Sequence, residues 1–263
     1  MSFQPTLALA GFAGWNVLKR TMPTQQAAFQ ANVAVQRDEA YFRSKIGKVD
    51  TAEQLVSDRR LLRVALGAYG LDNDINNKFF IRKVLEDGTL KEGALSNRLA
   101  DKQYLKFSAA FGFGDFKVPR NKLSDFADKT LGLYRTRQFE AAVGEQNNTY
   151  RLALNAEREL PLLARRGISD TAKWFTIMGN SPLREVVQTA LGLPRSFASL
   201  DLDKQLAVFQ KRAEAAFGSS SPDQFAVPET LDKLVRTFLL RAEVVDTASV
   251  ASPSSLALQL LRS

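Results

Sequence analysis

The sequence of 263 residues contains no cysteine and no histidine. Without cysteine there is no disulfide, no thiolate nucleophile and no cysteine-based zinc or iron–sulfur site. Without histidine the chain lacks the usual acid–base group that titrates near neutral pH, and also the commonest metal ligand. These two absences exclude most familiar catalytic sites, and we expect the protein to use no cofactor.

Long apolar runs are also absent. The longest candidate, residues 7–18, is interrupted by two glycines and an asparagine, and it falls short of the roughly 20 apolar residues that cross a bilayer. Residues 1–6 carry none of the positive charge that begins a secretory signal. We therefore expect no membrane span and no conventional export. A route that reads an uncleaved N-terminus, such as the flagellar type III pathway, remains open.

The residues that are present have the composition of an ordinary soluble globular protein, with 45% hydrophobic and 24% charged residues. Lys and Arg number 36 against 28 acidic residues, so an anionic partner such as nucleic acid is one hypothesis. The basic residues form short groups at helical spacing, which favours solvated helix faces. The alternative is an anion-binding patch, and its candidate residues are Arg59, Arg60, Arg63, Arg82 and Lys83.

Apolar residues recur at positions i, i+3, i+4 and i+7 along most of the chain, for example over residues 62–69, 183–191 and 231–239. Alternating patterns typical of β-strands are not visible. The pattern predicts an all-α fold, a multi-helix globule with about nine to eleven helices of ordinary length.

Local signals predict where some of these helices begin and end. Asp50 followed by Glu53 is typical of a capping box, and Ser181 followed by Pro182 is typical of an N-cap with a first-turn proline. Pro161 lies inside the apolar-periodic stretch 151–166, so we expect it to kink or divide that helix.

An internal repeat emerges when the chain is compared with itself. Residues 101–103 (DKQ) recur as 203–205, residues 109–112 (AAFG) as 215–218, and residues 116–119 (FKVP) as 225–228 (FAVP). Chance similarity between amphipathic helices is the alternative, but these shared words are not periodic. We predict a duplicated helical unit in four segments: an apolar N-terminal segment and first helix (1–50), repeat unit 1 (51–142), repeat unit 2 (144–243) and a C-terminal tail (244–263).

No motif in the chain predicts catalysis. Asp72, Asp74 and Asn76 begin like a calcium-binding EF-hand loop, but Asn77 stands where glycine is needed and Lys83 where the closing glutamate is needed. The glycine-rich nucleotide-binding patterns and the serine-hydrolase patterns are incomplete or absent. We therefore predict no catalytic residues, no metal ligands and no enzyme activity.

The N-terminal segment is strongly apolar but contains Pro5, Gly11 and Gly14, so it makes a poor autonomous helix and must be buried against something. Docking on the protein's own body is the interpretation we favour. The alternative is a surface that faces a partner, for which Phe12, Trp15 and Leu18 are the candidate binding residues.

Several long, non-periodic words resemble the bacterial DUF1217 family. They are residues 58–72 (DRRLLRVALGAYGLD), 75–86 (INNKFFIRKVLE), 95–101 (LSNRLAD) and 109–115 (AAFGFGD), with similar words at 150–158 (YRLALNAER) and 189–194 (TALGLP). The resemblance extends over nearly the whole chain. It implies an association with bacterial flagella, because members are encoded among flagellar genes, and it carries over no functional residue.

These observations lead to one main hypothesis and two alternatives. The main hypothesis is a non-enzymatic flagellar accessory protein, acting in assembly, export or motility regulation by binding another protein. The expected partner is a flagellar component. Its expected location is the cytoplasm, or the flagellar basal body after export without a signal peptide. The alternatives are a basic nucleic-acid-binding regulator and an enzyme that works without histidine and cysteine.

Overall fold

The computed structural model describes residues 3–250, and every regular element in that range is a helix. Thirteen α-helices and five short 3₁₀ helices are present over these residues. The predicted all-α class is confirmed. The number of α-helices exceeds the expected nine to eleven, because very short helices such as α3 (Ala52–Ser57) and α6 (Leu95–Arg98) have no room for a periodic apolar stripe.

The chain divides into two compact units. Of the described residues, unit 1 comprises 3–5 and 21–142, and unit 2 comprises 6–20 and 143–250. Two helices, α1 (Gly11–Gln30) and α8 (Phe126–Gln146), contribute residues to both units. The predicted repeat units 51–142 and 144–243 each lie within one unit; the duplication itself stays a prediction.

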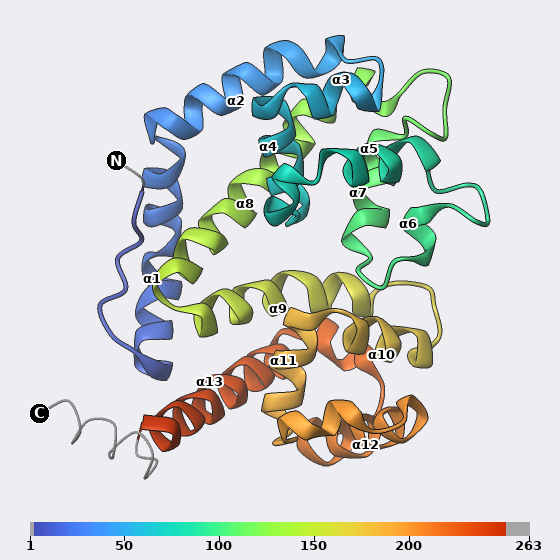
Figure 1. Ribbon diagram of the computed structural model, residues 1–263. Helices are drawn as coiled ribbons and strands as arrows, with labels where there is room; N and C mark the ends of the chain where they lie inside the picture. Colours follow the sequence, from blue (N-terminus) through green and yellow to red (C-terminus); the bar gives the residue numbers. More distant parts are fainter. Residues whose placement is uncertain (1–2, 251–263) are drawn as a thin grey trace, which may run out of the picture. The chain divides into compact units, whose positions relative to one another are not determined.

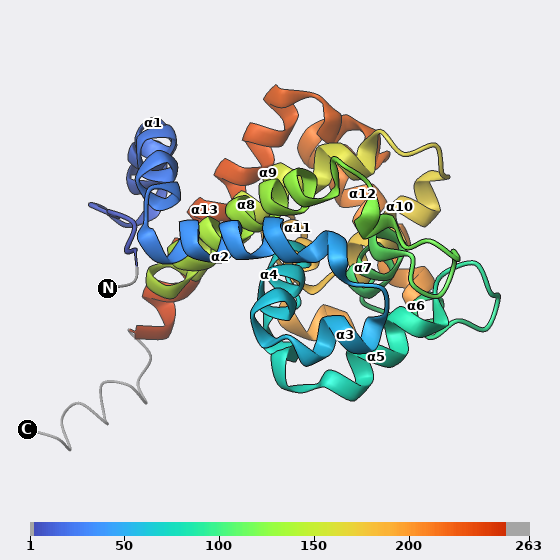
Figure 2. The ribbon, with the colours of Figure 1, turned by 90° about the horizontal axis from the view of Figure 1, so that it is seen from above.

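Unit 1 is organised around helix α4 (Arg59–Tyr69), which is surrounded by other helices of the unit in Figures 1 and 2. Eight of its eleven residues are buried, and Arg59, Arg60 and Arg63 supply the polar side of this amphipathic helix. Phe42, Leu62, Phe107 and Leu131 are fully enclosed in the same core. The other helices of the unit are α2 (Val33–Lys45), α3, α5 (Lys78–Asp87), α6 and α7 (Gln103–Phe111).

Unit 2 is built on α9 (Asn148–Ala164), which packs against α11 (Ser181–Ala190) and α13 (Pro228–Val250). A second part of its core stacks Trp174 of α10 (Asp170–Gly179) on Phe209 of α12 (Leu202–Phe217), with ring centroids 5.6 Å apart. The Trp174 indole donates a hydrogen bond to the Ser220 carbonyl oxygen, so its polar edge is also satisfied.

The predicted starts of two helices are wrong by one residue. The side chain of Thr51 caps α3 by accepting from the Gln54 amide, and the Gln54 side-chain oxygen accepts from the amide of Asp50, so the N-cap is Thr51. Asn180 caps α11 by accepting from the Leu183 amide at 3.0 Å. Ser181 and Pro182 therefore occupy its first turn, where proline's missing amide costs nothing.

Two other boundaries differ from the sequence pattern. Of the two predicted effects of Pro161, division of the helix is wrong, because Pro161 lies in the last turn of α9, which continues to Ala164. Helix α13 extends to Val250, so residues 244–250 of the predicted tail are helical, since lengthening a helix that is already anchored by its apolar face costs little. The remaining tail residues, 251–263, lie outside the described residues.

Candidate functional site

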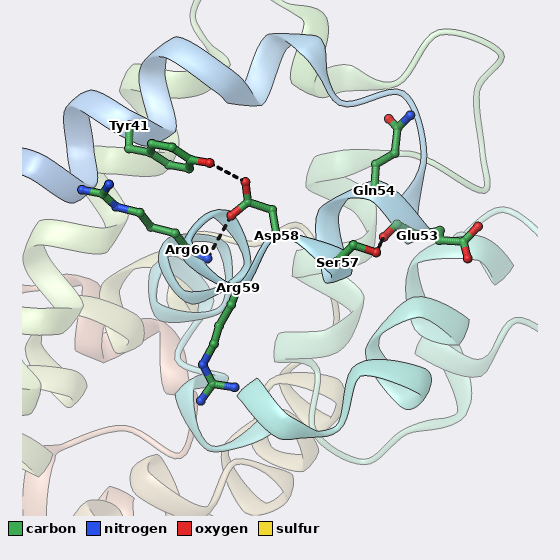
Figure 3. Close-up of a pocket in the computed structure, with 7 residues that line it drawn as sticks. All are labelled: Tyr41, Glu53, Gln54, Ser57, Asp58, Arg59 and Arg60. Atoms are coloured by element: carbon green, nitrogen blue, oxygen red, sulfur yellow. Dashed lines mark hydrogen bonds between the residues drawn. The ribbon is translucent and has the colours of Figure 1, made fainter.

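A wide, open pocket on unit 1 is lined by seven residues around the start of α4: Tyr41, Glu53, Gln54, Ser57, Asp58, Arg59 and Arg60. Figure 3 shows that these side chains do not converge, because Arg59 points away from Tyr41 and Glu53 points to the opposite side. Asp58 caps α4 by accepting from the amides of Arg60 and Leu61, both at 3.0 Å, and the Tyr41 hydroxyl donates to it at 2.7 Å.

These hydrogen bonds shift the pKa values of Asp58 and Tyr41. Partial burial raises the pKa of Asp58, but the bonds from the Leu61 amide, the Tyr41 hydroxyl and the Arg60 amide outweigh it and lower the pKa below its ordinary value. The same bond to Asp58 raises the pKa of Tyr41. Carboxylate and phenol therefore stabilise each other's resting charge state, and both serve to begin α4.

Four of the five residues of the predicted anion patch are paired with carboxylates. Arg60 and Arg63 both bind Asp38, at 2.8 and 2.7 Å. Lys83 pairs with Asp87 at 2.8 Å, and Arg82 lies between two glutamates, Glu53 and Glu86, at 3.5 and 3.6 Å. The fifth residue, Arg59, donates to the neutral side chain of Asn76. Most of the patch is thus neutralised locally, as the solvated-face interpretation expects.

The predicted partner-binding residues of the N-terminal segment lie against unit 2. Trp15 and Leu18 are 4% and 1% exposed, and Trp15 packs on Tyr150 with ring centroids 5.9 Å apart. Phe12 is partly buried under the guanidinium of Arg236. The alternative in which Trp15 and Leu18 face a partner is therefore wrong, because burial in their own unit removes both side chains from the surface. The N-terminal segment docks on the protein's own body, as the favoured interpretation had it.

Tyr150 explains how a segment so rich in helix breakers is held. Its hydroxyl lies 3.0 and 2.7 Å from the carbonyl oxygens of Leu9 and Gly11, at the point where α1 begins. A side chain on Gly14 would overlap this hydroxyl and the Leu9 carbonyl, so the glycine permits the close approach. Sequence reasoning missed Tyr150, because its partners are 139 and 141 residues away.

The acidic loop that begins like an EF-hand is occupied by internal bonds. Asp72 accepts from the Gln138 amide, and Asp74 accepts from the Tyr104 hydroxyl at 2.6 Å and from Asn77 at 2.7 Å. Across residues 3–250, acidic side chains do not gather in any group of three that could hold a metal ion. The loop instead ties the 3₁₀ helix Asp72–Asn76 to α7 and α8.

A different feature of unit 1 stands out, a pair of loops joined by one carboxylate. We call them the loop pair: residues 88–94, between α5 and α6, and residues 112–119, after α7, which lie side by side in Figures 1 and 2. Asp115 accepts from the Thr89 amide at 2.7 Å, from the Thr89 hydroxyl at 2.8 Å and from the Leu90 amide at 3.0 Å. Three bonds to one carboxylate hold the two loops together.

Two glycines allow the loops to approach. A Cβ atom on Gly114 would overlap the Glu86 carbonyl oxygen and the Gly88 amide nitrogen, both of them main-chain atoms that cannot rotate away. Gly88 itself has φ 70°, in the left-handed region that favours glycine. Only glycine at both positions fits this crossing.

Side chains of the short helix α6 complete the support of the first loop. Ser96, fully buried, donates to the Gly88 carbonyl at 2.7 Å. The Asn97 amide donates to the carbonyls of Thr89 and Lys91, at 2.9 and 3.0 Å. Two amides, three carbonyls and the Thr89 hydroxyl of loop 88–91 thus have partners, an arrangement that favours a rigid loop.

Large apolar side chains project from this rigid framework. Leu90 is 72% exposed, Val118 70% and Phe116 40%. The Phe116 ring lies under the guanidinium of Arg120, 4.6 Å from its centroid. A preorganised surface with exposed apolar side chains is what a protein-binding site requires, because little conformational entropy is lost when a partner covers it. We therefore take the loop pair as the candidate functional site.

The fold and this surface define an all-α protein of two helical units with a candidate interaction site. A family model described as a protein of unknown function, DUF1217, matches residues 68–226, more than half of the chain, and the protein belongs to this family. The resemblance drawn from the sequence words is thereby confirmed, and the loop pair lies within the matched residues.

A solved structure has a similar fold. It is the X-ray crystal structure of a protein from Agrobacterium tumefaciens, determined by the Northeast Structural Genomics Consortium, with a TM-score of 0.72 and 25% sequence identity. The alignment covers 91% of this chain and 98% of that chain. No curated protein matches the sequence.

Proposed function

We propose that this protein is a non-enzymatic flagellar accessory protein, acting in assembly, export or motility regulation by binding another protein. The observation that carries the binding role is the rigid loop pair with its exposed Leu90, Phe116 and Val118. The flagellar role rests on what the resemblance to the DUF1217 family implies, an association with flagellar genes.

Burial of these side chains would contribute free energy to binding. Complete burial of a fully exposed leucine, valine or phenylalanine contributes about 1.5–3 kcal/mol, and these side chains, 40–72% exposed, would gain part of that amount. Two or three such anchors, held in place before binding, are typical of an interface whose energy is concentrated in a few residues. The hydrogen bonds to Asp115, Ser96 and Asn97 keep the cost of ordering low.

Nucleic-acid binding through the predicted anion patch receives less support. Phosphate binding requires cations that are free to replace counterions, whereas Arg60, Arg63 and Lys83 of this patch are engaged by carboxylates. As for membranes, none of the helices within residues 3–250 combines the length and apolar character needed to cross a bilayer.

Two locations are compatible with the proposal: the cytoplasm, as an export chaperone or regulator, and the flagellar basal body, after export without a signal peptide. An antibody against the protein, applied to cytosolic and basal-body fractions of the same cells, distinguishes them. Signal in the basal-body fraction supports export, and signal confined to the cytosol supports the regulator.

Deletion of the gene from its flagellated host tests the proposed function. We expect reduced swimming in soft agar and fewer or shorter flagella by electron microscopy, both restored by a plasmid copy of the wild-type gene. Unchanged swimming and unchanged flagella in the deletion strain would refute the proposal.

A further inference from the structure

We infer that the loop pair binds an acidic segment of a partner protein that also carries apolar side chains. The inference rests on the proposed function and adds the chemistry of the partner. It follows from the segment at residues 116–123 (FKVPRNKL), which continues the second loop and in which apolar and basic residues are interleaved on the surface.

The exposed charges of this segment all have one sign. Lys117, Arg120 and Lys122 are exposed, and the nearest acidic residue in the loop, Asp115, is directed at Thr89 and Leu90 of the other loop. Lys122 pairs with Asp50 at 2.6 Å. Among the side chains described, residues 3–244, no carboxylate lies within ion-pair distance of Lys117 or Arg120, although Arg120 acts on Asp115 at longer range.

The first loop adds Lys91, which is exposed and has no ion pair among the residues described, and one exposed acid, Glu92. Lys91 directly follows the exposed Leu90 in the sequence, and Lys117 directly precedes the exposed Val118. A partner that buries these apolar side chains must also approach the cations, so carboxylates next to its own apolar residues would complement the surface.

The rigidity of the segment favours a protein over a lipid surface. The buried Asn121 amide donates to the carbonyls of Ile46 and Val49, at 2.7 and 2.8 Å, and so anchors the segment to the core. Asp115 anchors its other end. Because the segment is anchored at both ends, its apolar side chains form a surface of fixed shape. Such a surface can be complementary to a structured protein partner, whereas binding to a fluid bilayer does not depend on a fixed shape.

In-cell photocrosslinking with p-benzoylphenylalanine at position 118 tests the inference, with position 33 as the control. Val33 lies in the same unit and is 59% exposed, close to the 70% of Val118. We expect an adduct at position 118 that is absent at position 33. Mass spectrometry should place the adduct in a protein segment with net negative charge and apolar residues.

A charge-reversal pair adds a second readout. Lys91→Glu with Lys117→Glu should reduce the adduct at position 118 roughly 10-fold, because each exposed ion pair is worth about 2- to 5-fold in affinity and reversal adds repulsion. The matched control is Lys204→Glu with Lys211→Glu, which makes the same change in net charge on exposed residues of α12 in unit 2. This control should leave the adduct unchanged.

The outcomes separate the inference from the proposed function. An adduct in a neutral or basic protein segment, or one insensitive to the Lys91→Glu, Lys117→Glu pair, overturns the acidic partner and leaves protein binding in place. An adduct with phospholipid or nucleic acid, or no adduct at position 118 in flagellated cells, overturns both.

Discussion

Replacing Asp115 with alanine should release the two loops from each other at a cost of about 3 kcal/mol. The carboxylate accepts three hydrogen bonds, from the Thr89 amide, the Thr89 hydroxyl and the Leu90 amide. Each bond contributes about 1 kcal/mol net at a partly exposed site. Alanine leaves the two amides without an acceptor, whereas asparagine keeps one acceptor oxygen, so Asp115→Asn should cost about half as much.

Amide hydrogen exchange followed by mass spectrometry measures this effect locally. Because 1.4 kcal/mol corresponds to a factor of ten, peptides covering residues 88–94 should exchange roughly 100-fold faster in Asp115→Ala. Glu92→Gln, an exposed change in the same loop, is the control and should alter exchange less than 3-fold, in keeping with the roughly 0.5 kcal/mol of most surface substitutions. Equal exchange in Asp115→Ala and Glu92→Gln would refute the role of the carboxylate.

The pH dependence of the same exchange gives an independent check. Partial burial raises the pKa of Asp115, but the bonds from Thr89 and Leu90 outweigh burial and lower the pKa below its ordinary value. A carboxylate with a lowered pKa in the folded state contributes stability above about pH 4, and this contribution is lost as the pH falls through the folded-state pKa. The difference between the wild type and Asp115→Asn should therefore shrink below about pH 4.

Three further predictions concern stability, each measured by urea unfolding. Gly114→Ala should lower the free energy of unfolding by more than about 3 kcal/mol, because its Cβ meets main-chain atoms, whereas Gly132→Ala, in open space on α8, should raise it by about 0.5–1 kcal/mol. Similar values for the two variants would contradict the loop crossing. Leu18→Ala should cost about 2–5 kcal/mol and the exposed Leu9→Ala under 1 kcal/mol; equal costs would argue against docking of the N-terminal segment. Burial raises the pKa of Tyr69 to about 12, so the folded state keeps a proton that the unfolded chain loses near pH 10. The stability of the wild type should therefore fall between pH 10 and 12 by about 2–3 kcal/mol more than that of Tyr69→Phe. An equal fall in the wild type and in Tyr69→Phe would count against this assignment.

The fold class could be predicted because helical periodicity is a local signal. The repeated word AAFG, for example, ends a helix in both places where it occurs, at Gly112 with φ 67° and at Gly218 with φ 97°. Helix starts were less accurate, since Asp50 and Thr51 are both good caps and only the backbone geometry decides between them.

The candidate site could not be predicted, because its contacts join residues that are distant in sequence. Asp115 and Thr89 are 26 residues apart, and no spacing rule connects an aspartate to a loop in another supersecondary unit. The family word at residues 109–115 contains Gly112, Gly114 and Asp115 together. Its function as a loop clamp becomes visible only when Gly88 and Thr89 are placed against it.

The candidate anion patch shows a second limit of prediction from sequence, which concerns charge. Composition correctly located the clusters of positive charge, but it could not pair Arg60 and Arg63 with Asp38, which lies more than 20 residues earlier on α2. Exposure of charge is set by such tertiary pairs, so a sequence count overstates the free charge of a folded surface.

The central claim is that the exposed apolar side chains of the loop pair bind a flagellar partner. The most direct measurement is swimming in soft agar of a deletion strain that carries Leu90→Asp with Val118→Asp, compared with Val33→Asp with Leu162→Asp, whose residues are 59% and 60% exposed. With equal protein levels confirmed by immunoblot, we predict that the loop variant fails to restore swimming and the control variant restores it fully. Full restoration by the loop variant would contradict the account.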